Sequence, residues 1–112
     1  MATVLKQLGQ LTPSNTTAVS LYSPAASTET IVKSIVICNT DPDAAITYRI
    51  FHDDDGTTYD TTTALYYDVS LAANTSIVLE FSLMMNDSAG NLAVRTSQAD
   101  DLTFTCYGAE IT

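Results

Sequence analysis

The densest run of ionisable side chains in this sequence is HDDDGTTYD, at residues 52–60. Carboxylate oxygens are the hard ligands that calcium requires. An EF-hand loop with Gly56 at its sixth position would begin at Phe51 and end at Thr62, where a first aspartate and a last glutamate are needed. The EF-hand pattern therefore fails at both ends.

Two other interpretations of this run remain. A calcium site outside the EF-hand class would use Asp53, Asp55 and Asp60. Alternatively the run is the turn of a hairpin, because the dipeptide Asp55–Gly56 adopts the positive φ angles of a tight turn at low steric cost. Adjacent aspartates also keep a hairpin tip in water. We predict the turn.

The same run contains His52, the only histidine of the chain. A glycosidase needs two carboxylates held in a cleft, one of them with a raised pKa, and a row of acids in an exposed turn does not supply that environment. No serine motif such as GxSxG accompanies His52. The sequence therefore predicts that the chain is not an enzyme, and we assign no catalytic residue, no cofactor or cofactor-binding residue and no metal ligand.

The two cysteines, Cys38 and Cys106, form no CxxC motif. Their spacing is similar to that of the paired cysteines of an immunoglobulin domain, but the chain has no tryptophan to pack on such a bridge. Only six residues follow Cys106, too few for the last strand of that topology. Two small buried thiols are the favoured interpretation, and a disulfide stays open.

Composition restricts the partners. The chain of 112 residues has a formal net charge of −9 and only four basic residues, so it repels phosphate backbones and anionic lipids. We expect no nucleic acid and no membrane among its partners. The N-terminal segment MATVLKQLGQL lacks the basic start and the continuous apolar stretch of a secretory signal, which predicts a soluble protein made in a cytoplasm.

Alternation of apolar and polar residues in steps of two predicts β-strands over several segments. On this pattern the inward residues of segments 75–83, 64–71 and 101–108 are Ile77, Leu79, Phe81 and Leu83; Leu65, Tyr67, Val69 and Leu71; and Leu102, Phe104 and Cys106. Further strands are expected over 18–23, 30–38, 45–52 and 91–96. The segment 30–38 is apolar on both faces, which predicts a central strand covered on both sides.

Turn signals separate these segments at short intervals. The pattern predicts an all-β fold: an antiparallel β-sandwich or jelly-roll-like barrel of about six to eight short strands. We divide the chain into an N-terminal arm, residues 1–12, and a single sandwich domain, residues 13–112. The arm is either an edge strand or a segment that packs on a neighbouring subunit.

Three or four tyrosines from one set are expected to point outward. The set is Tyr59, Tyr66, Tyr67 and Tyr107. An aromatic ring with a polar tip serves either a sugar-binding surface or a protein interface, and we favour an interface.

The stretch SIVICNTDPDAAITYRIFHDDDGTTYDTTTALYYDVSLAANTSIVLEF, residues 34–81, resembles small virion structural proteins of tailed bacteriophages, especially capsid decoration or cement proteins. The likeness lies in the order of its elements, from an Ile/Val-rich strand ending at Cys38 and Asn39, through an aspartate-rich hairpin and a tyrosine-bearing strand, to AANT before an alternating strand. It extends from about Leu11 to the closing YGAEIT.

This resemblance implies a β-sandwich subunit, commonly a homotrimer, that binds the major capsid protein on the outer surface of the virion and stabilises the assembled head. Synthesis in the host cytoplasm follows from that role. An acidic domain also suits an outer surface better than contact with a packaged genome. We hypothesise that subunits meet around a three-fold axis through strand edges and tyrosines, with the arm reaching an adjacent capsomer. The alternative is a tail, neck or fibre module that binds a host carbohydrate or receptor.

Overall fold

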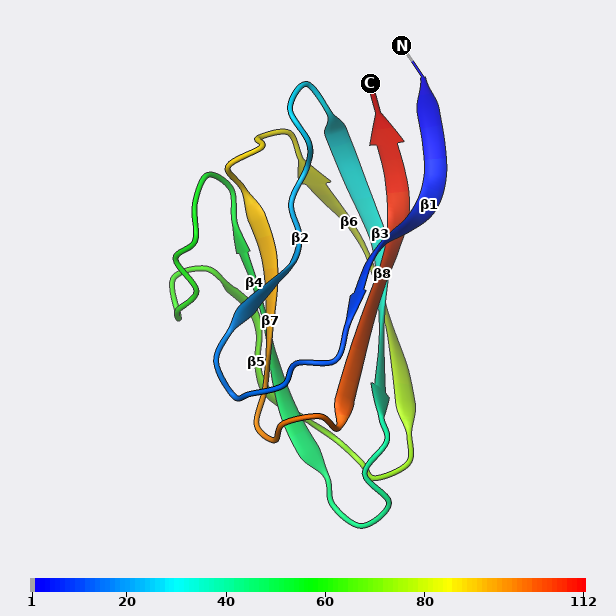
Figure 1. Cartoon of the computed structure of the whole chain (residues 1–112), viewed down its shortest axis with the longest axis vertical. Coiled ribbons are helices and arrows are strands. Elements are labelled where there is room, and N and C mark those ends of the chain that lie inside the picture. The colour runs from blue at the N-terminus through cyan, green and yellow to red at the C-terminus, as the bar shows by residue number, and fades with distance from the viewer. Residues whose placement is uncertain (1) are drawn as a thin grey trace.

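The computed structural model describes residues 2–112, which form eight strands in two antiparallel sheets and no helix. The strands are β1 (Thr3–Leu11), β2 (Val19–Tyr22), β3 (Glu29–Asn39), β4 (Ile46–Asp53), β5 (Ala64–Leu71), β6 (Ser76–Met85), β7 (Asn91–Thr96) and β8 (Leu102–Ile111). Sheet A has the order β1-β8-β3-β6 and sheet B the order β2-β7-β4-β5, and the two sheets face each other (Figure 1). The predicted all-β sandwich is confirmed. No helix in the described part of the chain is long and apolar enough to cross a membrane.

The core lies between the sheets and is built from every second residue of the central strands. β8 contributes Leu102, Phe104 and Cys106, all fully buried as the alternation predicted. β4 contributes Ile46, Tyr48 and Ile50 from the facing sheet. Because each strand contributes one face only, the outer faces of both sheets are left for contacts other than the main core.

The strand β3 differs from its prediction. It is central within sheet A, between β8 and β6, but the sandwich has two layers and covers only one of its faces. Val32 and Ile35 point into the core, whereas Ile31 and Val36 lie half-buried on the outer face. A register irregularity between Val32 and Ser34 shifts the alternation by one residue. The expected covering on both sides is wrong.

The strand β5 has part of its predicted alternation reversed. Tyr66 packs against the core, while Leu65 and Tyr67 are exposed, opposite to the expectation. Asp68 has a φ of 53°, in the left-handed region, and the register with β4 shifts at this point. Beyond this bulge Leu71 is buried as predicted, whereas Val69, also expected to face inward, is 36% exposed.

The segment predicted as an N-terminal arm forms β1 from residue 3 to residue 11, an edge strand of sheet A paired with β8. Two backbone hydrogen bonds of 2.9 Å between Ala2 and Thr112 extend this pairing to the chain ends, which lie side by side in Figure 1. Leu8 and Leu11 pack on the core, but Val4 and Leu5 are exposed. Whether residues 1–12 also contact a neighbouring subunit stays a prediction.

Candidate functional site

The aspartate run forms an ordered loop rather than a free set of ligands. The Asp53 carboxylate accepts hydrogen bonds from the backbone N–H of Asp55 at 3.2 Å and of Thr58 at 2.8 Å. The Asp60 carboxylate accepts one from the backbone N–H of Thr62 at 2.8 Å. Hydrogen bonds from backbone N–H groups lower the pKa of Asp53, and those from Thr62 lower the pKa of Asp60. These carboxylates stabilise the loop as Asx-type turns.

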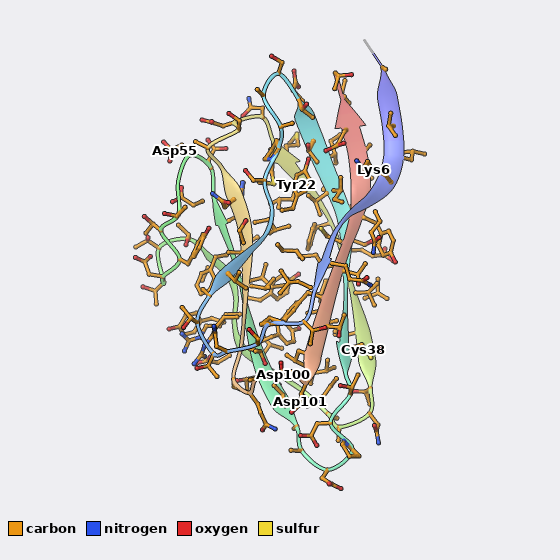
Figure 2. All side chains as sticks on the ribbon, viewed as in Figure 1. Lys6, Tyr22, Cys38, Asp55, Asp100 and Asp101 are labelled. Atoms are coloured by element: carbon orange, nitrogen blue, oxygen red, sulfur yellow. The ribbon has the colours of Figure 1, made fainter. Side chains whose placement is uncertain are left out.

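The predicted turn is present, but its type differs from the expectation. Neither Asp55 nor Gly56 has a positive φ angle. Within residues 2–112 no group of three or more His, Cys, Asp or Glu side chains is arranged to hold a metal ion. Figure 2 shows Asp55 at the outer end of the loop, pointing away from the sandwich.

The loop also covers part of the outer face of sheet B. Tyr59 lies over Phe51 of β4, with ring centroids 6.2 Å apart, and Tyr67 of β5 meets the same ring edge-on at 6.5 Å. The side-chain amide of Asn91 donates to the Gly56 carbonyl at 2.8 Å. These contacts leave Phe51 buried although it points away from the main core. The loop therefore protects a small second apolar cluster.

The His52 side chain makes no hydrogen bond within residues 2–112. The backbone N–H of this residue donates to the Thr63 carbonyl at 2.9 Å, and the imidazole Nε2 is buried with no hydrogen-bond partner among the described residues. It lies on β4 opposite Leu92 of β7.

The cysteines lie on opposite faces of sheet A. Cys106 points into the core opposite Ile35, and burial raises the pKa of its thiol to about 11. Cys38 is paired with Thr103 and Ser76 on the outer face and is labelled at the lower end of β3 in Figure 2. Both are free thiols, and side chains on opposite faces cannot be bridged.

Two arginines meet on the outer face of sheet B. Arg49 and Arg95 are paired across β4 and β7, and the carboxylate of Asp68 on β5 forms ion pairs with both. Arg49 binds the Asp68 carboxylate through Nε at 2.7 Å and Nη2 at 3.1 Å, and its guanidinium lies 3.9 Å from the ring centroid of Tyr67. These hydrogen bonds raise the pKa of Arg49 and lower that of Asp68. Asp68 thus relieves the repulsion between two neighbouring cations.

A polar network joins the two sheets at the end where the termini lie. The Tyr22 hydroxyl of β2 donates to Glu110 Oε2 of β8 at 2.6 Å and lies 2.7 Å from Thr30 Oγ1. Lys6 of β1 binds Glu110 Oε1 at 3.1 Å. Burial raises the pKa of Tyr22 to about 12, and the hydrogen bonds from Tyr22 and Lys6 lower the pKa of Glu110. Figure 2 shows Lys6 and Tyr22 at this end.

This network predicts a specific contribution to stability at acid pH. Because the folded pKa of Glu110 is depressed, its stabilisation is present above the ordinary pKa of 4.5 and is lost as pH falls through the folded value. We expect the free energy of unfolding at pH 7 to be about 1 kcal/mol higher for wild type than for the Glu110→Gln variant. The difference should shrink below pH 4.5.

Urea denaturation of both proteins from pH 3 to pH 7 measures this difference. At each pH the free energy of unfolding of the variant is subtracted from that of wild type. This difference excludes the other carboxylates, because they titrate in both proteins. A difference that does not change with pH would contradict the assignment.

One row of apolar residues crosses the whole outer face of sheet A near the termini. The pairing of the four strands places Leu5, Ala109, Ile31 and Met84 side by side. We call these four residues the terminal apolar row. Its ends are open to solvent, with Leu5 83% and Met84 72% exposed. Large apolar side chains left open in this way mark interaction surfaces.

A groove adjoins the Met84 end of this row. Its volume is about 250 Å³. It is lined by Glu29, Thr30, Ile31, Met84, Met85, Asn86 and Ile111. The row and the groove together form the candidate interaction surface of the chain. None of their residues was singled out as a site by the sequence.

No protein-family model matches this sequence, and no curated protein matches it. Among solved structures, a chain in the crystal structure of the T13 viral particle of infectious bursal disease virus is similar, at a TM-score of 0.52 and 15% identity over 97% of this chain. A chain of the VP2 subviral particle of the same virus gives a TM-score of 0.48 at 16% identity over 97% of this chain. This chain spans 29% and 31% of the length of those two chains.

Of these two similarities, only the first, with a TM-score of 0.52, supports a conclusion, and it shows the fold alone. The first of them extends over nearly all of the sandwich described above, so its topology also occurs in a chain of a virus particle. That similarity assigns no role to any residue of the terminal apolar row. A function for this row has to be inferred from the exposure and the apolar character of its side chains.

The structure does not bring the four tyrosines together. Tyr107 lies on the outer face of sheet A, whereas Tyr59 and Tyr67 contact Phe51 on sheet B. Tyr66 points inward and packs against Tyr48, with ring centroids 6.4 Å apart. The expected outward direction is therefore wrong for Tyr66. A single aromatic surface made of all four is absent from the described chain.

Proposed function

We propose that this chain is a non-enzymatic structural protein of a virion, which decorates the outer surface of an assembled bacteriophage head and stabilises it. The observation that carries the proposal is the terminal apolar row, exposed at both ends on a folded domain. The similarity of the fold to a chain of a virus particle supports the coarser part, a virion structural role. The resemblance of residues 34–81 to decoration proteins supports the finer part.

The row docks on the major capsid protein, together with the exposed first half of β1. Val4, 52% exposed, points to one side of this half-strand and Leu5 to the other. A strand segment with apolar side chains on both sides can insert between two surfaces of a shell. Binding to the assembled shell in preference to its separated parts stabilises the assembly by mass action.

Charge sets the orientation of this docking. The chain carries a net charge of −9, so it approaches a basic capsid surface and is repelled by nucleic acid. Glu29 lies beside the groove and is exposed. It is placed to meet a cation at the edge of the apolar contact.

Replacing the exposed apolar residues of β1 tests this function. Val4→Thr with Leu5→Thr keeps strand-forming residues but removes apolar surface, and each lost contact is worth about 1–2 kcal/mol when fully buried. We expect binding to head particles that lack the subunit to weaken at least about ten-fold. Cosedimentation of labelled protein with such particles measures the affinity.

Leu65→Thr is the matched control, because Leu65 is also exposed but lies on β5 in sheet B. It should bind as wild type does. Equal binding by the double variant would remove β1 from the docking surface. Failure of the wild-type protein to bind the head would contradict the proposed function.

A tail, neck or fibre module is the second candidate, favoured by the exposed Tyr67 ring beside the Arg49 guanidinium. Aromatic rings with adjacent polar groups can bind sugars. A glycan array with wild type and Tyr67→Ala decides between the candidates. Binding that is lost in the variant would support this module over the head protein.

A further inference from the structure

The strand β6 leaves one edge of sheet A open. It is ten residues long, its neighbour on one side is β3, and no strand from residues 2–112 lies on its other side. The other three edges carry features that hinder pairing: β1 has Lys6, β2 is only four residues long, and β5 has the bulge at Asp68. β6 has one charged residue, Glu80, and its burial alternates throughout, although its register against β3 shifts between Leu83 and Glu80. A long open edge of this kind is a template for another strand.

The pattern of apolar and polar residues in β6 is symmetric about Phe81. The positions equidistant from Phe81 match in polarity: Glu80 with Ser82, Leu79 with Leu83, Val78 with Met84, Ile77 with Met85, and Ser76 with Asn86. Two identical strands that run antiparallel and meet at Phe81 therefore place apolar side chains opposite apolar ones on both faces. Cross-strand pairs of this kind stabilise a sheet.

Charge points to the same pairing. Lys6, Arg49 and Arg95 are in ion pairs, whereas Lys33 makes none within residues 2–112 and donates only to Ser82 Oγ, at 3.4 Å. Glu80 also has no ionic partner in the described chain. In the antiparallel pairing the second copy's Glu80 lies opposite Ser82, and hence beside Lys33. Each copy supplies the charge that the other lacks.

Side chains next to this edge are incompletely covered. A shallow hollow of about 560 Å³ lies along β6 and β3. It is lined by Lys33, Ser34, Val78, Glu80, Phe81 and Ser82. The core-facing side chains of β6 are only partly buried at this edge. A second strand would cover them.

We propose that two copies of this chain associate through β6, antiparallel and centred on Phe81, so that two four-stranded sheets become one continuous sheet of eight strands. The association is two-fold, because antiparallel pairing of identical strands relates the copies by a two-fold axis. It does not rest on the proposed function, since it concerns the chain alone. It differs from the three-fold association that the family resemblance implies.

Charge reversal tests the pairing. Lys33→Glu alone and Glu80→Lys alone should each weaken dimerisation about ten-fold, because two ion pairs per dimer become repulsive. The double variant Lys33→Glu with Glu80→Lys should return to within about three-fold of wild type. Sedimentation equilibrium at about 0.15 M salt measures the dissociation constants.

Glu29→Lys is the matched control. It changes the net charge in the same direction as Glu80→Lys, but it lies at the start of β3, away from Phe81. It should dimerise at least as well as wild type, because it lowers the overall repulsion between copies. Weakening equal to that of Glu80→Lys would overturn the assignment to β6.

Cysteine crosslinking tests the register. In a Cys38→Ser background, subunits with Glu80→Cys and subunits with Ser82→Cys should form a disulfide when mixed, because these positions are directly opposed. Each variant alone places its cysteines diagonally, at about 7–8 Å, too far for a bond. Crosslinking only in the mixture supports the register. A protein that is monomeric or trimeric at millimolar concentration, or equal crosslinking by either variant alone, would overturn the proposal.

Discussion

Asn39→Asp should destabilise the sandwich by about 3–5 kcal/mol, one of the largest effects of any single substitution in the chain. Asn39 is 1% exposed, and its side-chain N–H groups donate to the carbonyls of Ala44, Leu71 and Ala72 at 3.1, 3.0 and 3.2 Å. The change replaces this donor with an oxygen, so a carboxylate would face three carbonyl oxygens without water. The loops that meet at this end of the sandwich would lose their common anchor.

The effect should depend on pH. Burial among carbonyl oxygens raises the folded pKa of the new carboxyl above its unfolded value of about 3.9. The variant is therefore least destabilised below pH 4, where the carboxyl is neutral in both states. The loss should grow as pH rises above that value. Urea denaturation at pH 4 and pH 7 measures it.

Asn86→Asp is the matched control, since it makes the same chemical change at an exposed position. It should cost less than about 0.5 kcal/mol. If Asn39→Asp lowers the free energy of unfolding only slightly at pH 7, the three carbonyls have other hydrogen-bond donors in solution.

Gly108→Ala should destabilise the protein by about 3 kcal/mol or more, because the added methyl group has no space. A Cβ at Gly108 would lie only 2.0 Å from the carbonyl oxygen of Ile31, and 3.0 Å from Leu8 Cδ1. A backbone oxygen in the centre of sheet A cannot move without breaking the pairing of β3 with β8. Thermal denaturation followed by circular dichroism measures the loss.

Gly56→Ala controls for the general effect of replacing glycine. Its Cβ would meet only the Asp53 carboxylate, at 3.1 Å, and that side chain can move. We expect a change below about 1 kcal/mol. Equal losses in the two variants would contradict the steric explanation for Gly108.

The sequence predicted the class of fold because two-residue alternation survives in the strands that border the core. In β6 the residues expected to face inward are the partly buried ones, and in β8 they are fully buried. These strands have one face toward the other sheet, so burial and polarity coincide. The turn over residues 53–56 was found from its composition, although the positive φ angles expected of Asp55 and Gly56 are absent.

The errors have local causes that alternation cannot detect. In β5 a single residue, Asp68, takes a left-handed conformation, and the phase of Leu65, Tyr66 and Tyr67 reverses before it. A bulge adds one residue without changing composition, so the same letters fit either phase. The loop at 53–63 was expected as a solvated tip, but Tyr59 turns it back over Phe51.

The candidate interaction surface could not be predicted from the sequence. Leu5, Ile31, Met84 and Ala109 are far apart in the chain and become neighbours only through the register of four strands. Each alone resembles an ordinary strand residue. Asn39 was noted only as the end of a strand, although the three carbonyls that its side chain binds come from two separate segments.

The pairing of Ala2 with Thr112 has a practical consequence for attaching foreign sequences. Peptides joined at either end would leave from one corner of the sandwich, next to the apolar row of sheet A. Bulky cargo there would obstruct that row, whereas an insertion at Asp55, on the outer end of the aspartate loop, would project from the opposite sheet. The loop is therefore the better position for display of a foreign epitope.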